Sequence, residues 1–342
     1  YYAAGILPNA ANTVPTQKAD IINLSLGGPT RSQAEQNAIT AAREQGVIII
    51  AAAGNTSSSA YSYPAAYEGV IDVSAVDASK KLAPYSNYGD SIDVAAPGGD
   101  FSKDLNQDGY GDGILSTGGD DSSGSIQNVY SFYNGTSMAA PHVAGVVALM
   151  KSLHPALDPT ELDVLLTSGL TTQDIGAVGR DDLYGHGLID AYKAVEALKD
   201  GIPAALYVNP SSLNFQLSID NLAVTVGNIG TDPEELIAVE TPYSDADWLS
   251  ILPADIDETT GLGTYEVTVD RSNLPDGPYY TTLIFESKQF ESKQNDVAIP
   301  VSMEVGDITA TGDLGFHYIL LLDANTFEWV DQVEVSASNG LY

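Results

Sequence analysis

Residues 134–150 read NGTSMAAPHVAGVVALM, a turn of small residues that runs into a long apolar segment. The apolar segment predicts a helix over residues 137–153 that is buried on nearly all sides in the middle of a domain. Ser137 would stand in the first turn of that helix, where unpaired N–H groups and the helix dipole favour developing negative charge. Gly135 leaves space for an extended polypeptide to pass close to the serine. Because serine also commonly caps helices, Ser137 alone does not establish a chemistry.

The chain upstream alternates short apolar runs with helical ones. Residues 21–26 and 47–53 are apolar runs typical of buried parallel strands, and the alanine-rich residues 32–45 between them predict a helix that ends at Gly46. Two further strands and two closing helices are expected at residues 70–76, 92–96, 159–170 and 189–198. Residues 1–200 are therefore predicted to form an α/β domain with a mostly parallel sheet.

The pattern changes after residue 200. Short runs with alternating polarity are separated by turn residues, which is typical of an all-β sandwich over residues 201–305. The clearest of these predicted strands are residues 222–226, 265–269, 281–285 and 297–301. A third segment, residues 306–342, contains one clear strand at 318–322 and is expected to be the start of a further, truncated β domain.

Three blocks of sequence resemble the subtilisin-like serine proteases, or subtilases, in the order that this family has them. They are Ser25–Gly28, Ala51–Asn55 and Asn134–Gly145. The resemblance implies a three-layer α/β catalytic domain in which Ser137 is the nucleophile and Asn55 donates a side-chain hydrogen bond to the oxyanion. It also implies the segments that bind the extended substrate, namely Ser25, Leu26, Gly27 and Gly28 on one side and Ala53 and Gly54 on the other.

Residues 62–67, SYPAAY, resemble the far wall of the primary specificity pocket in the same family. Ser62 would stand near the base of the pocket, with Tyr63 beside it. The stretch contains no carboxylate and no cation, so we expect bulky, uncharged side chains at the substrate position before the cleaved bond.

The catalytic acid and base of a subtilase do not accompany Ser137. In this family the triad runs Asp, His, Ser along the chain, yet no histidine precedes Ser137. His142 is five residues after Ser137, which places it about 140° around the predicted helix. Its side chain should therefore point away from Ser137. The other histidines, at positions 154, 186 and 317, are not credible bases either. We expect the Asp and His to lie in an N-terminal segment outside this sequence, and this chain alone to be inactive.

Residues 104–112, DLNQDGYGD, match the spacing of an EF-hand calcium loop. Gly109 would allow the sharp turn, and position 12 is Leu115 rather than the usual glutamate. Asp100, Asp120 or Asp121 could supply the missing ligand. We therefore predict a structural calcium ion whose ligands are Asp104, Asn106, Asp108, Asp112 and the backbone carbonyl of Tyr110.

Composition limits the partners. The chain carries 46 acidic and 13 basic residues, a formal net charge of −33, which disfavours nucleic acid and anionic membrane surfaces. It has no cysteine, and no apolar run is long enough to span a membrane. We expect an extracellular, bacterial, monomeric protein that acts on proteins or peptides.

Two functions remain open from the sequence. Residues 243–252 and 261–265 resemble BACON-type and related Ig-like modules that follow bacterial hydrolase domains. Trp248 within this region is expected to be a core aromatic, with a binding platform as the alternative. The chain is thus either part of a secreted endopeptidase or a non-catalytic binding or adhesion protein built on a subtilase scaffold. An upstream Asp and His would decide for the protease.

Overall fold

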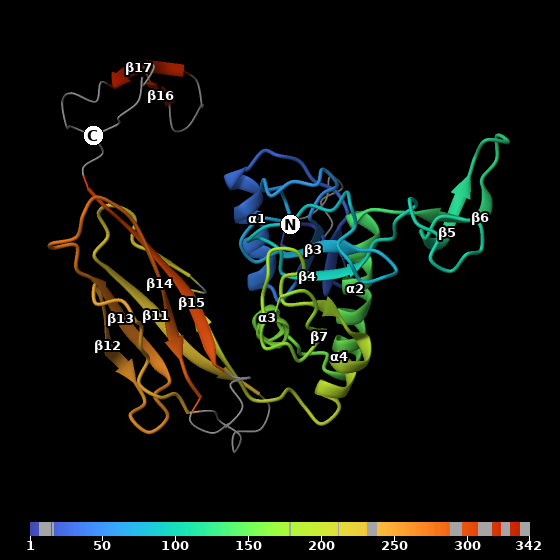
Figure 1. Cartoon of the computed structure of the whole chain (residues 1–342). Coiled ribbons are helices and arrows are strands. Elements are labelled where there is room, and N and C mark those ends of the chain that lie inside the picture. Colours follow the sequence, from blue (N-terminus) through green and yellow to red (C-terminus); the bar gives the residue numbers. More distant parts are fainter. Residues whose placement is uncertain are drawn as a thin grey trace.

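The computed structural model describes residues 1–6, 15, 17–177, 179–210, 212–230, 238–287 and 296–306, and the backbone of residues 317–322 and 329–335. An α/β part comes first, and β-sheets follow it (Figure 1). Its helices are α1 (Gln33–Glu44), α2 (Thr136–Leu153), α3 (Pro159–Thr167) and α4 (Ala191–Leu198). Its strands are β1 (Ile21–Leu24), β2 (Ile48–Ala52), β3 (Ile71–Val76), β4 (Val94–Pro97), β5 (Ile114–Asp120), β6 (Gln127–Tyr133), β7 (Thr172–Gln173) and β8 (Leu188–Ile189).

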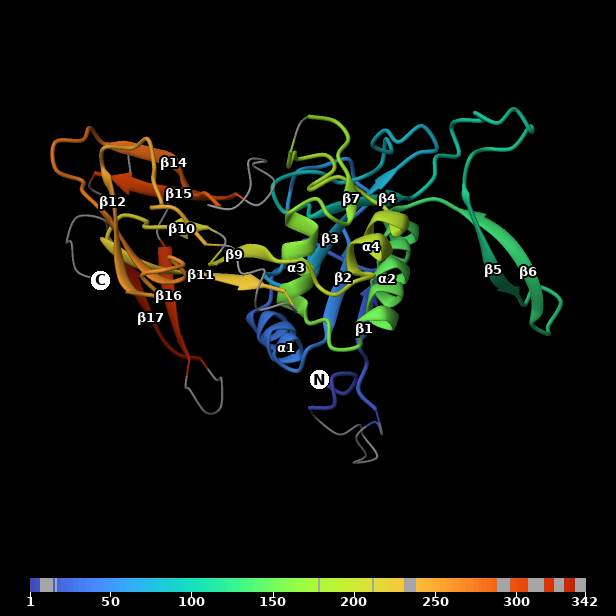
Figure 2. The ribbon, with the colours of Figure 1, turned by 90° about the horizontal axis from the view of Figure 1, so that it is seen from below.

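The main sheet is mostly parallel, as predicted. Its strand order is β1-β2-β3-β4-β8-β7, and only β7 runs antiparallel to its neighbour. Side chains alternate between the two faces of a strand, so Ile48 and Ile50 enter a cluster with α2, α3 and α4. Ile49 and Ala51 enter a second cluster with α1. The sheet is thus the middle layer between helices (Figure 2).

The local signals for α1 were correct. Ser32 is the N-cap, and its hydroxyl oxygen accepts a hydrogen bond from the N–H of Glu35. The helix ends at Glu44, and Gly46 has a φ of 77°, which lets the chain turn into β2. Of the two predicted closing helices, the second begins two residues later than expected, because Ile189 pairs with Thr172 in the sheet.

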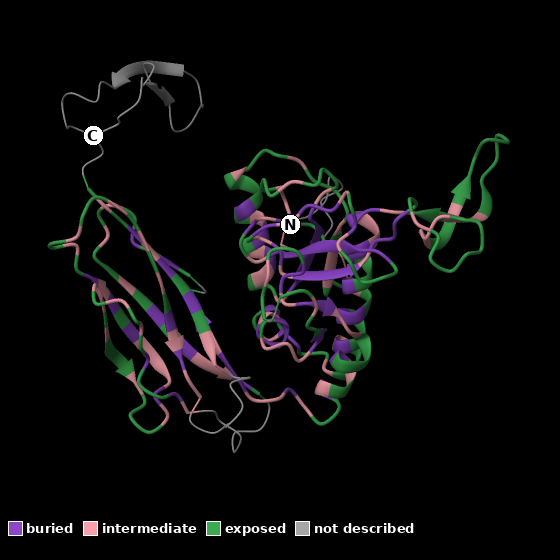
Figure 3. Ribbon diagram, in the orientation of Figure 1, coloured by how far each residue is buried: buried purple, intermediate pink, exposed green. Residues whose placement is uncertain are grey.

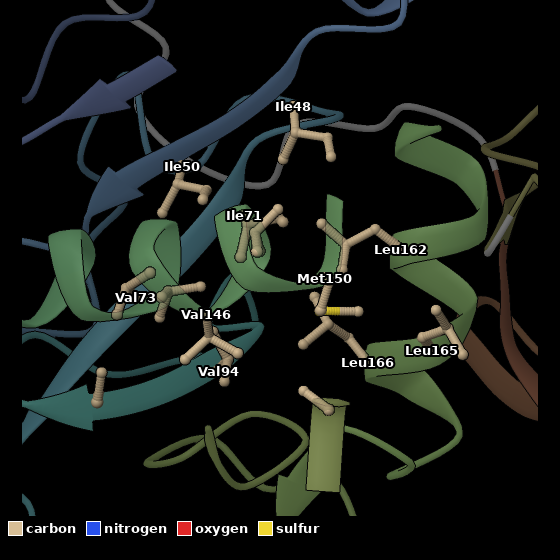
Figure 4. Close-up of a cluster of buried hydrophobic side chains, with 14 of the residues drawn as sticks. Ile48, Ile50, Ile71, Val73, Val94, Val146, Met150, Leu162, Leu165 and Leu166 are labelled. Carbon is tan, nitrogen blue, oxygen red and sulfur yellow. The ribbon is translucent and has the colours of Figure 1, made fainter. Parts of the chain in front are cut away.

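Helix α2 lies against the sheet, but it is not buried on all sides as predicted. One face, which includes Val143, Val147 and Met150, belongs to the large apolar cluster (Figure 4). The opposite face is exposed to solvent and carries a stripe at helical spacing: His142, Gly145, Leu149 and Leu153. The prediction was wrong for this face because apolar composition indicates that a helix favours burial, whereas the described elements cover only one side of α2.

An antiparallel ribbon of β5 and β6 extends away from the α/β part and was not predicted (Figure 1). Leu115 and Phe132 are partners across the ribbon, as are Thr117 and Tyr130. Leu115, Tyr130 and Phe132 are all exposed, so one face of the ribbon presents apolar side chains to solvent. Most of the ribbon is coloured as exposed in Figure 3. The second strand ends at Tyr133, directly before the turn that carries Ser137.

Two β-sheets follow residue 200. One has the order β10-β15-β14 and the other β12-β13-β11-β9, and their inward side chains form one shared core. All pairings within them are antiparallel except that of β10 with β15. The strands are β9 (Ala205–Asn209), β10 (Leu213–Asn214), β11 (Asn221–Ile229), β12 (Leu249–Ile256), β13 (Gly263–Val269), β14 (Gly277–Phe285) and β15 (Val297–Val305).

Trp248 packs against the shared core of these two sheets and meets Tyr279 edge to face, with ring centroids 6.2 Å apart. This position fits the expected core aromatic. Beyond the sheets, β16 (His317–Leu322) and β17 (Trp329–Val335) form an antiparallel pair. The strand expected at residues 318–322 is therefore present.

Candidate active site

Ser137 lies in the first turn of α2, and the preceding turn is pinned to the sheet. Gly135 is the N-cap, its φ is 149°, and its N–H donates to the carbonyl of Gly98 beyond β4 (2.9 Å). The Ser25 hydroxyl donates to the carbonyl of Ser137 (2.9 Å). Ser137 Oγ itself makes only a long contact with the carbonyl of Ser25 (3.5 Å). The turn fixes the serine backbone while leaving its hydroxyl without a strong partner.

Asn55 follows the end of β2, and its side chain is held by the residue before the serine. The N–H and the hydroxyl of Thr136 both donate to Asn55 Oδ1, at 2.9 and 3.0 Å. The Thr136 hydroxyl also accepts the N–H of Gly54 (3.1 Å). Because the oxygen end of the amide is occupied, its Nδ2 is the end that can donate elsewhere.

Two donors meet in the space beside Gly135. A carbon atom added at the Cβ position of Gly135 would lie 3.5 Å from Asn55 Nδ2 and 3.7 Å from the backbone nitrogen of Ser137. The Asn55 amide, whose Oδ1 lies 3.6 Å from the same point, and the backbone nitrogen of Ser137 therefore border the same side of Gly135. Paired N–H donors next to a nucleophile are the arrangement that stabilises the oxyanion of acyl transfer.

The predicted substrate segments lie side by side around this point. Gly28 and Tyr63 form an antiparallel bridge in which each N–H donates to the other carbonyl (2.8 Å both). A Cβ on Gly27 would meet Ser62 Oγ at 3.0 Å, so these two segments touch. Gly27 and Leu26 are exposed, whereas Ala53 is buried beneath the turn. The structure thus brings together Ser25–Gly28, Ala53–Asn55, Ser62 and Tyr63.

None of the histidines in the described part of the chain is hydrogen-bonded to Ser137. His142 Nδ1 pairs with the carbonyl of Met138 (2.8 Å), and His154 Nε2 pairs with the carbonyl of Leu198 (2.9 Å). Burial, together with nearby Arg180, lowers the pKa of His186 to about 4. The side chain of His317 lies outside the described residues.

The acidic loop, residues 104–112, folds back on its own side chains. Asp104 accepts the N–H groups of Asp108 (3.1 Å) and Gly109 (2.9 Å), and Asp108 accepts that of Tyr110 (2.9 Å). Asp112 accepts the N–H of Leu105 (2.8 Å). Across the described residues, however, no three His, Cys, Asp or Glu side chains gather as a metal-holding group. The structure places the loop's oxygens near one another without assembling a complete coordination shell.

The three candidates for an additional calcium ligand are located differently. Asp120 and Asp121 are at the far end of β5, away from the acidic loop. Asp100 is buried and pairs with Asp112 through the backbone, but its carboxylate faces Ser102 and Lys103. Lys103 also binds the buried Asp77. Burial pushes the pKa of Asp77 upward, but hydrogen bonds from Lys103, Ser79 and Lys81 outweigh burial and lower it to about 2.

The buried carboxyl of Asp72 in β3 lies near the half-buried Asp93, which directly precedes β4. Asp93 Oδ2 accepts the N–H of Asp72 (2.7 Å), and the Ser91 hydroxyl donates to Asp72 Oδ2 (2.8 Å). Asp72 Oδ1 is buried without a hydrogen-bond partner in the described structure. Burial and the neighbouring Asp93 carboxylate raise the pKa of Asp72 well above its ordinary value, and burial raises that of Asp93 to about 7.

Two residues of the site were not predicted from the sequence. Thr136 orients Asn55 and stands inside the NGTS turn. Its position directly before Ser137 is the sequence feature that could have indicated a role in the site. Asn87, which contacts both sides of Asn55, lies in the loop between β3 and β4. No sequence pattern near Asn87 signals this contact.

None of the helices in the described part of the chain is long and apolar enough to cross a membrane. Subtilisin DY of Bacillus licheniformis is 38% identical to this chain over 181 residues, covering 52% of this chain and 57% of the relative. The thermostable alkaline protease of Halalkalibacterium halodurans is 35% identical over 176 residues, covering 52% of this chain and 42% of the relative. The chain thus spans about half the length of the curated relatives that it matches.

A solved protease structure from Pseudoalteromonas arctica is 39% identical, has a TM-score of 0.49, and covers 57% of this chain and 56% of that chain. The model of the subtilase family (peptidase S8) matches residues 2–187, more than half of the sequence. The chain therefore belongs to the subtilase family of serine endopeptidases.

Proposed function

We propose that this chain is the nucleophile-bearing part of a secreted bacterial endopeptidase. Ser137 Oγ attacks the carbonyl carbon of a peptide bond while a histidine base takes the hydroxyl proton, and the resulting oxyanion accepts hydrogen bonds from the Ser137 N–H and from Asn55 Nδ2. The histidine then returns the proton to the nitrogen of the departing amine. The collapse of this intermediate releases the amine and leaves an acyl-enzyme, which water then hydrolyses. The observation that carries the proposal is the meeting of these two donors beside Gly135.

The substrate is a protein or peptide in extended form. The exposed Ser25–Gly27 segment offers backbone groups for pairing, whereas those of Gly28 are already paired with Tyr63. Because Gly27 has no side chain, Ser62 and Tyr63 can lie close against it. Ser62 and Tyr63 would line the pocket for the side chain before the cleaved bond. Since residues 62–67 contain no charge, bulky uncharged side chains should be preferred.

The base and its orienting acid are proposed to come from a further segment that supplies an Asp and a His. Strand β1 is an edge strand of the six-stranded sheet, so one of its sides is unpaired within the described structure. Helix α2 lies against β1 (Figure 2). Its exposed stripe carries Leu149 and Leu153. A segment that adds to the β1 edge and covers this stripe would bury apolar surface along the length of α2. We refer to this chain together with that segment as the completed enzyme.

Calcium is proposed to bind the acidic loop as a structural ion. The donors are all oxygens, as calcium requires, and Gly109 has a φ of 89° at the sharp turn. The N–H groups that Asp104 and Asp108 accept draw their carboxylates to the inside of the loop. The ion would hold the loop that joins β4 to the β5–β6 ribbon.

Residues 1–200 are proposed as the catalytic part, 201–305 as an Ig-like module related to the BACON type, and 306–342 as the start of another β domain. Two sheets around one core support the second of these assignments. The module would serve as a spacer or hold the enzyme near its substrate.

The function is tested by labelling with a serine-directed fluorophosphonate and by hydrolysis of a chromogenic peptide with a bulky uncharged residue before the cleaved bond. The completed enzyme should react and turn over, and its Ser137→Ala variant should do neither. This chain alone should not turn over, because loss of the histidine costs roughly 10⁶-fold in turnover in a subtilisin. A completed enzyme that neither reacts nor hydrolyses would favour a binding protein instead.

A further inference from the structure

We propose that Asn87 is a positioning residue that fixes the backbone on both sides of the oxyanion donor Asn55. The inference rests on the proposed function, since it assigns a role within the same site. Asn87 is buried in the loop between β3 and β4 and does not follow Asn55 closely in sequence. Its influence on the reaction would pass through Asn55, because no contact joins its side chain to Ser137 within the described structure.

Both ends of the Asn87 amide are used. Its Nδ2 donates to the carbonyl of Ala53 (2.9 Å), two residues before Asn55. Its Oδ1 accepts the N–H and the hydroxyl of Thr56, the residue after Asn55 (2.9 Å each). In addition, the backbone N–H of Asn87 donates to the carbonyl of Gly54 (2.9 Å). Residues 53, 54 and 56 are therefore all bound by one residue, and Asn55 stands between them.

The contact requires an amide in one orientation. A carbonyl oxygen on one side needs a donor, and an N–H on the other side needs an acceptor, so a flipped amide would place donor against donor. An aspartate would bring a carboxylate against the carbonyl of Ala53. An alanine would leave a buried carbonyl and a buried N–H without partners, which is costly. Asparagine fits because its side chain is short and carries both groups.

Gly54 ties the conformation of the turn to Asn87 directly. Its φ is 111°, a region that favours glycine, and a Cβ at this position would lie 2.5 Å from Asn87 Nδ2. The Asn87 side chain thus packs against the space that the glycine leaves. Displacing the Asn87 side chain would release the backbone of residues 53–56 and so move the Asn55 side chain.

Thr136 and Asn87 have separate tasks. Thr136 binds the Asn55 side chain through Oδ1 and so decides which end of that amide faces the oxyanion. Asn87 binds the main chain that carries Asn55 and so decides where the amide stands. Both are needed because an oxyanion donor acts only at 2.7–3.1 Å or thereabouts, and a displacement of about 1 Å can cost about 10²-fold in rate.

The test is a double-mutant cycle in the completed enzyme, made from Asn87→Ala, Asn55→Ala and the double variant. Asn87→Ala should lower kcat by about 10- to 10²-fold with little change in KM, because the substrate segments remain. In the Asn55→Ala background the same substitution should cost less than about twofold, since the donor it positions is gone. Ser86→Ala is the matched control: its buried hydroxyl donates to the Asn87 carbonyl but does not touch residues 53–56. It should keep kcat.

A second measurement needs no activity and uses this chain alone, labelled with ¹⁵N-asparagine. Asn87→Asp should shift or broaden the side-chain amide resonances of Asn55, assigned through Asn55→Ala, and Ser86→Ala should not. Additive losses in the cycle, or Asn55 resonances unmoved by Asn87→Asp, would overturn the inference. An inactive wild-type completed enzyme would instead count against the proposed function, and the resonance measurement would still decide the role of Asn87.

Discussion

Thr136 donates two hydrogen bonds to Asn55 Oδ1, one from its N–H at 2.9 Å and one from its hydroxyl at 3.0 Å. The residue next to Ser137, the proposed nucleophile, thus orients the side chain proposed to stabilise the oxyanion. Thr136 is fully buried, so no water competes for these bonds. Asn55 and Ser137 are therefore positioned by the same turn.

Removing the Thr136 hydroxyl should loosen this donor. In the completed enzyme, Thr136→Val is expected to lower kcat by about tenfold, because one of the two bonds to Asn55 Oδ1 is lost and the N–H of Gly54 loses its acceptor. Steady-state kinetics on a chromogenic peptide measure the effect. Thr172→Val, which removes another buried hydroxyl, that one bonded to the His186 carbonyl, is the control and should retain kcat. Equal losses for both variants would contradict a specific role.

The carboxyls of Asp72 and Asp93 should make stability depend on pH. Both carboxyls lose their protons near pH 4 in the unfolded chain, whereas the folded state holds them up to higher pH, about 7 for Asp93. Folding therefore takes up protons between these values, and the free energy of unfolding falls as pH rises through this interval. Asp72→Asn should raise the melting temperature at pH 8 more than at pH 5.

Differential scanning calorimetry of this chain checks that prediction, with Asp200→Asn on the surface as the control. The control should change the melting temperature little at either pH. An equal shift of Asp72→Asn at pH 5 and pH 8 would mean that ionisation of the pair is not what destabilises the folded state.

Calcium should stabilise the chain through the acidic loop. After chelation, added calcium at about 100 times its dissociation constant should stabilise the wild type by about 2.7 kcal/mol, seen as a rise in melting temperature. The gain should disappear in Asp104→Ala combined with Asp108→Ala. Asp121→Ala, at the far end of the ribbon, should keep it. Calcium titration of wild type and variants by calorimetry would show the same difference, and a wild type without binding would refute the site.

The exposed stripe of α2 should matter only for assembly. Leu149→Arg is expected to leave the melting temperature of this chain nearly unchanged, since Leu149 is 50% exposed. It should nevertheless prevent hydrolytic activity from appearing when the Asp- and His-bearing segment is added, because a charge would be buried without a partner. Tyr192→Arg, an exposed apolar position on α4, should allow assembly. Activity with Leu149→Arg equal to wild type would place the segment elsewhere.

The parallel sheet and its helices could be predicted because their signals are local. Ser32 and Gly46 bracket α1, and the apolar runs at residues 47–53 and 70–76 indicate buried strands whatever surrounds them. The β5–β6 ribbon could not, since residues 114–133 are rich in Gly and Ser and bury little that a periodic pattern would reveal. Its strands are held by hydrogen bonds to each other, and backbone pairing of this kind does not require a periodic pattern of apolar residues.

The candidate site was predicted in part. The motifs placed Ser137, Asn55 and the substrate segments, and the structure brings those segments together, although their roles remain predictions. The hydrogen bonds of Asn87 could not be predicted from the sequence. They join the loop after β3 to the turn after β2, and these two segments are far apart in the sequence. Every histidine of this sequence follows Ser137, so the origin of the base stays a prediction.

The join between the α/β part and the following sheets is not a loose tether. Ile202, Ala205 and Ile229 belong to the same apolar cluster as Leu165 and Leu198. These contacts pack the start of the second β-sheet region against the α/β part, so the two are joined by apolar packing as well as by the chain. A flexible insertion at residue 201 would therefore separate the two parts, and Ile202, Ala205 and Ile229 would lose their apolar contacts with the α/β part.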